Sequence, residues 1–272
     1  MTRTVVFIHG GWVTPACWQP FASYFEARGY RTIAPPWPGK DRPVDDIRRD
    51  PSSLAGLGIA EIVDHYEAII RSLDEPPILV GHSFGGLFVQ LLLDRGLGAA
   101  GIAIDSAAPK GVFALEPTSL LSLGRILAIP FGWRKVVRWT FAEFRYAFVH
   151  TMPLDDARAI WDAQIVPDAG RPFFEAGFSM LDPHSPATID FANPDRAPLL
   201  FISGEADRPI PPRVVRRMYR KHLASPARTD LLTFPGRTHW IIAQPGWEEV
   251  AEACISWGES LDDVPQDSSA AA

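Results

Sequence analysis

Short runs of β-branched and other apolar residues alternate along the chain with longer amphipathic runs. This alternation predicts parallel strands joined by crossover helices, and glycine, proline or polar residues bound each run. We expect six strands in one sheet, at residues 4–8, 31–34, 78–80, 101–104, 199–203 and 229–234. Helices are expected between them at residues 17–28, 56–73, 84–95, 211–223 and 247–260. The pattern therefore predicts an α/β fold.

One interval breaks the alternation, because residues 107–197 separate the fourth predicted strand from the fifth. That length is too great for a simple crossover. Its pattern is helical in pieces, at residues 120–127, 133–151 and 155–164, and prolines separate them. We interpret it as a helical cap inserted into a core of residues 1–106 and 198–260. The last residues, 261–272, are acidic and then rich in Ser and Ala, which predicts a disordered tail.

Composition narrows the function. The chain has 272 residues, of which 47% are hydrophobic, enough for one large core. A formal net charge of -6 argues against a nucleic-acid-binding surface. Neither a secretory signal nor a membrane-spanning stretch is expected, so we predict a cytoplasmic protein. Cys17 and Cys254 lack disulfide or metal spacing, as do the cap residues His150, Asp182 and His184.

A serine stands where one predicted buried strand turns sharply into a helix. The segment from Gly81 to Gly85 fits the pattern G-x-S-x-G, with Ser83 at its centre. Glycine is needed at both ends because strand and helix leave no room there for side chains. The strained turn exposes the hydroxyl, and the helix N-terminus favours negative charge beside it. Ser83 is the candidate nucleophile, and an ordinary N-cap serine is the alternative.

A serine hydroxyl needs a base and a carboxylate to become an effective nucleophile. His239 follows the sixth predicted strand, and Asp207 follows the fifth. Because parallel strands end at one edge of a sheet, we expect both to approach Ser83 there. Glu205, two residues before Asp207, and Asp105, after the fourth strand, stay open as alternatives for the carboxylate.

Negative charge on a reacting carbonyl oxygen needs two amide donors. Phe84 supplies one at the start of its helix, and the loop after the first strand is the natural source of the other. Gly11 is the first choice, and Trp12 is either the alternative donor or a wall of the pocket. His9 and His82 are expected to be structural, since a second base would have no task.

The chain resembles the α/β-hydrolase superfamily in four segments: His9-Gly10-Gly11-Trp12, Gly81-His82-Ser83-Phe84-Gly85-Gly86, Gly204-Glu205-Ala206-Asp207 and His239. The resemblance covers nearly the whole chain and is weakest in the cap. It implies a mostly parallel sheet flanked by helices, here with six strands because the chain begins at the superfamily's third. The opening is similar to plant methylesterases and hydroxynitrile lyases, and those lyases use the same triad on cyanohydrins.

Large apolar side chains are numerous in the predicted cap and predict an apolar pocket above the sheet. Any single one is more often a packing residue. The candidates for substrate contact are Trp12, Phe113, Phe144, Phe148 and Trp240. The apolar pocket leads us to expect a small hydrophobic ester as partner. We also expect no cofactor, and a monomer or homodimer.

Residues and resemblance together favour a carboxylic-ester hydrolase that works through an acyl-enzyme. Lactone hydrolysis, amide hydrolysis, acyl transfer and cyanohydrin cleavage on the same triad stay open. A ligand receptor that keeps the fold without turnover is the alternative from another class.

Overall fold

The computed structural model describes residues 3–262, so the predicted tail lies outside the described residues except for its first two positions. All six strands of the main sheet are parallel, in the order β2-β1-β3-β4-β7-β8. They are β1 Thr4–Ile8, β2 Arg31–Ile33, β3 Ile78–His82, β4 Ala100–Ile104, β7 Leu199–Gly204 and β8 Thr229–Phe234. The predicted six-stranded α/β fold is confirmed.

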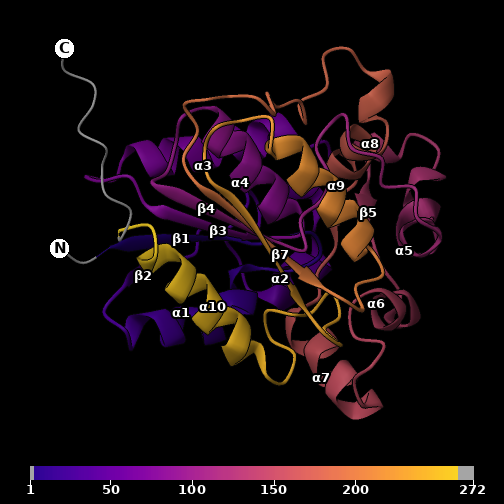
Figure 1. Cartoon of the computed structure of the whole chain (residues 1–272). Coiled ribbons are helices and arrows are strands. Elements are labelled where there is room, and N and C mark those ends of the chain that lie inside the picture. Colours follow the sequence, from indigo (N-terminus) through magenta and orange to yellow (C-terminus); the bar gives the residue numbers. More distant parts are fainter. Residues whose placement is uncertain (1–2, 263–272) are drawn as a thin grey trace, which may run out of the picture.

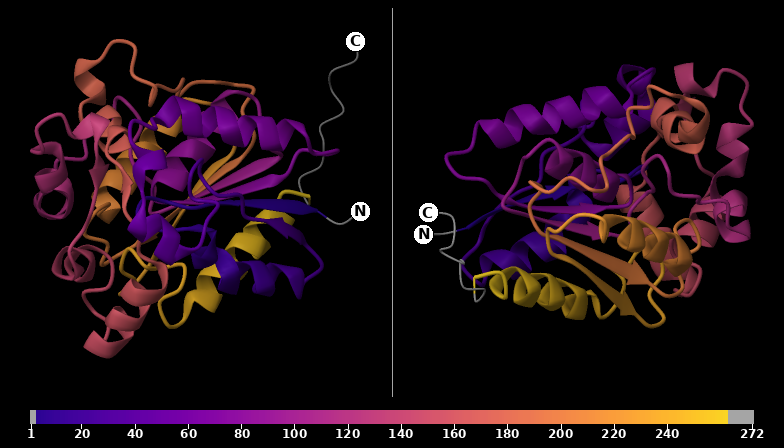
Figure 2. Two further views of the ribbon diagram at one scale, coloured as in Figure 1. Left: turned by 180° about the vertical axis from the view of Figure 1, so that it is seen from behind. Right: turned by 45° about the horizontal axis from the view of Figure 1, so that its top comes forward.

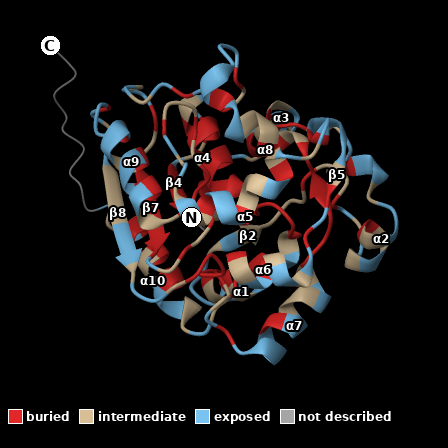
Figure 3. Ribbon diagram, turned by 90° about the vertical axis from the view of Figure 1, so that its right-hand side faces the viewer, coloured by how far each residue is buried: buried red, intermediate tan, exposed pale blue. Residues whose placement is uncertain are grey.

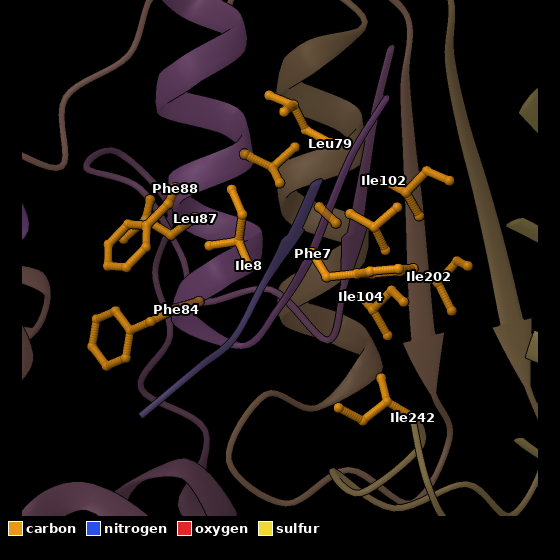
Figure 4. Packing of buried hydrophobic residues seen from close by; sticks show 14 of the residues in the cluster. Phe7, Ile8, Leu79, Phe84, Leu87, Phe88, Ile102, Ile104, Ile202 and Ile242 are labelled. Atoms are coloured by element: carbon orange, nitrogen blue, oxygen red, sulfur yellow. The ribbon is translucent and has the colours of Figure 1, made fainter. Parts of the chain in front are cut away.

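Burial follows strand order. Every residue of β3, β4 and β7 is buried, whereas the edge strands β2 and β8 are partly exposed. This difference explains why the central strands read as continuous apolar runs, since helices cover them on both faces. Phe7 of β1 stacks on Trp18 at 4.9 Å between ring centroids, and Ile104 and Ile202 pack nearby (Figure 4).

Helices flank both faces of the sheet (Figure 1). On one face lie α1 Gln19–Glu26 and α10 Trp247–Glu259; on the other lie α3 Ile59–Arg71, α4 Phe84–Asp94 and α9 Pro212–His222. α3 begins three residues later than predicted, because Gly56 has a φ of +79° and Gly58 is extended. A short helix, α2 Val44–Arg49, and the 3₁₀ turns Pro15–Trp18 and Ser52–Leu54 were not predicted.

The segment 107–197, which we call the cap segment, lies at the carboxyl ends of the strands, opposite the described chain ends (Figures 1 and 2). Its helices are α5 Pro117–Leu127, α6 Phe141–Ala147, α7 Leu154–Gln164 and α8 Arg171–Gly177, with 3₁₀ turns at Gly132–Arg134 and Ser179–Leu181. Exposed and buried positions alternate along these short helices (Figure 3). No helix within residues 3–262 is both long and apolar enough to cross a membrane.

The prediction of one helix over residues 133–151 is wrong. Val136–Val137 forms a short strand, β5, which pairs antiparallel with β6, Asp168–Ala169. Helix α6 then begins at Phe141, because Thr140 and Glu143 form a capping box at its N-terminus. The short strand and the separate start of α6 therefore divide a segment for which the apolar pattern alone predicts one continuous helix.

Candidate active site

Ser83 lies at the apex of the turn between β3 and α4, with φ +58° and ψ -120°, a conformation that non-glycine residues rarely adopt. The flanking backbone leaves no room for a side chain at positions 81 and 85. A Cβ on Gly81 would lie 2.1 Å from the Gly85 carbonyl oxygen, and a Cβ on Gly85 would lie 1.9 Å from the Ile8 carbonyl oxygen. The predicted requirement for both glycines is therefore steric, and the packing that excludes side chains fixes the Ser83 turn.

His239 and Asp207 lie together at the same edge. The Nδ1 atom of His239 is 2.5 Å from Oδ2 of Asp207, and the Ile210 amide donates to Oδ1 of Asp207 at 2.7 Å. Both side chains are almost fully buried. Burial lowers the pKa of His239 to about 3, so the ring is neutral near pH 7. With Nδ1 held by the carboxylate, Nε2 is left as the proton acceptor.

Asp105, at the end of β4, lies behind this pair with a φ of +42°. Its Oδ1 accepts from the Gly204 amide at 2.7 Å, whereas its buried Oδ2 has no hydrogen-bond partner among the described residues. Burial and then the Asp207 charge raise the pKa of Asp105. Burial also raises the pKa of Asp207, and the hydrogen bond from the Ile210 amide opposes this effect. Glu205 is exposed, and its carboxylate accepts from the Gly236 amide.

The loop after β1 lies against Ser83. A Cβ on Gly10 would be 2.7 Å from Ser83 Cβ, so only glycine permits this approach. Within the described residues the amides of Gly11 and Phe84 donate no hydrogen bond, which leaves both free for a ligand. The Trp12 amide instead donates to Asp168 Oδ2 at 2.6 Å. Of the two loop residues considered from the sequence, Gly11 therefore has the free donor.

His9 and His82 have structural contacts, as expected. The Trp37 amide donates to Nε2 of His9, whose Nδ1 contacts the Gly10 carbonyl at 2.8 Å. Nε2 of His82 contacts the His239 carbonyl at 2.7 Å, so it supports the loop that carries the imidazole. Burial lowers the pKa of both rings well below the usual value, so both are neutral. One possible metal-ligand atom each from His82, Asp105 and His239 lies within 4.8 Å of the other two. In each of the two histidines, however, one ring nitrogen already makes a hydrogen bond within the protein.

Ser83 and His239 open onto one cavity of about 390 Å³ between the sheet edge and the cap segment. Its other walls are mostly apolar, as predicted, and include Trp12, Phe113 and Phe148. The Ser83 hydroxyl makes no hydrogen bond to His239 or to any other described residue. Such bonds are often long in unliganded enzymes and shorten when substrate binds.

Two of the predicted contact residues do not line this cavity. Phe144 is fully buried and packs on Phe148 and Trp161. Trp240 is also buried and lies beside Phe148, with ring centroids 6.1 Å apart. Both residues pack against Phe148 and not against the cavity. The sequence could not show this, because apolar periodicity alone does not distinguish a lining residue from a packing residue.

Sequence reasoning missed a buried ion pair beside the loop after β1. Lys40 Nζ lies 2.7 Å from Oδ2 of Asp168, and both side chains are 0% exposed. These residues are 128 positions apart in the chain. No motif or spacing pointed to them, because their contact depends on where the cap segment sits.

A model of the alpha/beta hydrolase family matches residues 5–253. A monoacylglycerol lipase from Paleococcus ferrophilus is 21% identical with a TM-score of 0.66, covering 94% of this chain and 95% of that one. A pyrethroid hydrolase from Sphingobium faniae JZ-2 is 18% identical with a TM-score of 0.65, covering 97% and 100%.

An extracellular alpha/beta-hydrolase from a Paenibacillus species is 20% identical with a TM-score of 0.65, covering 93% of this chain and 98% of that one. It is described as sharing structural and functional homology with tobacco salicylic acid binding protein 2. Comparison with curated proteins found no match. At these identities the solved structures establish a shared fold.

Proposed function

Because the chain belongs to the alpha/beta hydrolase family, we propose that it is a serine hydrolase that cleaves carboxylic esters of small to medium hydrophobic substrates. One observation carries the proposal. A serine in a strained turn and a neutral imidazole face the same apolar cavity, and a buried carboxylate holds the imidazole's other nitrogen. This combination of nucleophile, base and orienting acid is suited to acyl transfer.

In the proposed reaction Ser83 Oγ attacks the ester carbonyl carbon while Nε2 of His239 takes the hydroxyl proton. Asp207 stabilises the imidazolium that forms. The amides of Gly11 and Phe84 donate to the oxygen that becomes negative, and the N-terminus of α4 adds its dipole. His239 then protonates the departing alkoxide, which leaves an acyl group on Ser83. Water, deprotonated by His239, releases the acid and restores the serine.

The cavity supports the choice of substrate class. Its walls carry few polar groups apart from Ser83 and His239, so they match an acyl chain or an aromatic ring rather than a charged ligand. A volume of about 390 Å³ suits a small or medium ester.

Labelling with a fluorophosphonate, read by intact mass and peptide mapping, tests the proposal. We expect one adduct on Ser83, no adduct in Ser83→Ala, and slow labelling in His239→Ala. Ser119→Ala is the matched control, since Ser119 lines the same cavity, and it should label as fast as the wild type. Labelling elsewhere, or none, would favour a non-catalytic receptor. A panel of p-nitrophenyl esters, lactones and amides then identifies the bond that is cleaved.

A further inference from the structure

The loop after β1 is held from two sides, with Gly11 between the two attachments. On the core side, Trp37 stacks on His9 at 5.1 Å between ring centroids and bonds it through the Trp37 amide. On the cap side, the Trp12 amide donates to Asp168 at 2.6 Å, and the Val166 amide donates to the Trp12 carbonyl at 2.8 Å. Both backbone polar groups of Trp12 are therefore bonded to the cap segment.

The backbone at Trp12 needs such support. Its φ of +61° is in the left-handed region, which is strained for a large side chain. Its ring stacks on Trp139 at 3.6 Å between centroids and packs against the tilted ring of Phe173 at 4.4 Å. The peptide between Gly11 and Trp12 therefore has a fixed orientation, and this also limits how the Gly11 amide can turn.

Lys40 completes the cap-side attachment. Its Nζ bonds Asp168 Oδ2 at 2.7 Å and the Val13 carbonyl at 3.1 Å, and it lies 4.3 Å from the Trp37 ring centroid. Burial lowers the pKa of Lys40, and the Asp168 charge opposes this change. A buried charge without its partner is costly, so removing either member of the pair alone would be destabilising. The Ala169 amide donates to the second oxygen, Asp168 Oδ1, at 2.8 Å.

We infer that the buried Lys40–Asp168 pair is a positioning device for the proposed oxyanion donor. An oxygen of Asp168 accepts from the Trp12 amide, which fixes the strained peptide and aims the adjacent Gly11 amide beside Ser83, while Lys40 balances the buried charge of Asp168. Because Asp168 and Val166 belong to the cap segment, donor geometry depends on how that segment is seated. The inference rests on the proposed function, since it presumes that Gly11 binds a developing oxyanion.

Two double variants separate positioning from simple stabilisation. Lys40→Met with Asp168→Asn removes both charges but keeps an oxygen that can accept from the Trp12 amide. Lys40→Met with Asp168→Leu removes both charges and the acceptor with a similar side-chain volume. Neither variant leaves an unpaired buried charge, so both are expected to fold. Far-UV circular dichroism and urea unfolding verify folding, and Asp168→Ala replaces Asp168→Leu if the latter does not fold.

We expect the Asn double variant to keep kcat within about threefold of the wild type on a p-nitrophenyl ester. The Leu double variant should lose about 10- to 100-fold in kcat with KM changed less than about threefold, because only transition-state binding is weakened. A trifluoromethyl ketone, which forms a tetrahedral adduct with Ser83, should lose affinity by the same factor as kcat. Equal kcat in the two folded double variants, or a loss confined to KM, would overturn the inference.

Hydrogen exchange of the segment 9–14 gives a readout that does not need activity. The Trp12 amide should stay protected in the Asn double variant and exchange faster in the Leu double variant. Unchanged protection in the Leu variant would show that Asp168 does not hold the loop. A wild-type protein without Ser83 labelling would refute the proposed function, and the exchange experiment would still decide whether the ion pair holds the loop.

Discussion

The sheet edge and the cap segment form opposite walls of one cavity, but different forces hold them. At the sheet edge, backbone packing and short hydrogen bonds fix buried polar side chains, with Ser83 only 9% exposed. In the cap segment, short helices pack through apolar side chains. Ten of the twelve large hydrophobic residues exposed within residues 3–262 lie there, the exceptions being Leu223 and Leu232. Changes at the sheet edge should therefore alter rate and folding, whereas changes at the exposed apolar positions of the cap should alter substrate choice.

The largest contrast should appear between two histidines. His239→Ala removes the proposed base, and we expect kcat/KM for a p-nitrophenyl ester to fall about 10⁵- to 10⁶-fold. His150→Ala, in the half-buried cap position, should change it less than about threefold. Steady-state assays with active-site titration measure both. A loss below about 100-fold for His239→Ala would remove this residue from the reaction.

Replacing either of the two carboxyl groups behind His239 should lower kcat, but by amounts that differ by several orders of magnitude. Asp207→Asn should lower kcat about 10⁴-fold, because the amide cannot stabilise the imidazolium or hold the reactive tautomer. Asp105→Asn should cost about tenfold or less, since burial and the Asp207 charge raise the pKa of Asp105 and so favour a neutral form that the amide nearly matches in shape. The reverse order in the measured kcat would identify Asp105 as the orienting acid.

A matched pair of helical glycines compares the two regions in stability. Gly85→Ala would force a Cβ to within 1.9 Å of the Ile8 carbonyl oxygen, so we expect a loss of about 4 kcal/mol or more in the free energy of unfolding. Gly124→Ala, in α5, meets no atom within 4 Å and should gain about 0.5–1 kcal/mol. Urea unfolding checks both. A mild effect at Gly85 would contradict the steric argument for the turn.

Lowering the pH should decrease the free energy of unfolding, because histidines on the sheet side are buried in the neutral form. Burial is the main cause that lowers the pKa of His9, His82, His222 and His239, to about 3 for the last two. Below about pH 6.5 the unfolded chain binds protons that the folded chain excludes. The free energy of unfolding therefore decreases as the pH is lowered from about 6.5 towards the folded-state pKa values. The cost is about 2 kcal/mol per histidine at pH 5. His222→Gln should reduce the measured slope by one proton, and an unchanged slope would contradict the assignment.

The smallest effects should come from the cavity mouth. Leu115 and Leu181 line the cavity and are 66% and 80% exposed. Replacing either with serine should raise KM for long-chain p-nitrophenyl esters about three- to tenfold, because about 1 kcal/mol of apolar contact is lost. The acetate ester should be unaffected. An equal change in kcat for both esters would mean that these residues influence the chemistry itself.

The same contrast decides what could be predicted from sequence. Strands β1 and β8 match their predicted bounds. Ser83 and His239 line one cavity and His239 bonds Asp207, because local motifs place these residues in loops after parallel strands. The cap segment follows no such rule. Its helix boundaries and the lining roles of Phe144 and Trp240 depend on tertiary packing, and so does the Lys40–Asp168 contact. A buried lysine is unusual, and nothing in the pattern around position 40 predicts its partner.

The central claim is that the Ser83 oxygen becomes covalently acylated during turnover. Rapid mixing of the enzyme with an excess of a p-nitrophenyl ester, followed by acid quench and mass analysis, tests it directly. We expect a burst of one p-nitrophenol per chain and an acyl group on the peptide containing Ser83, which accumulates when deacylation is slower than acylation. Ester hydrolysis without any acylated Ser83, at every time before completion, would contradict it.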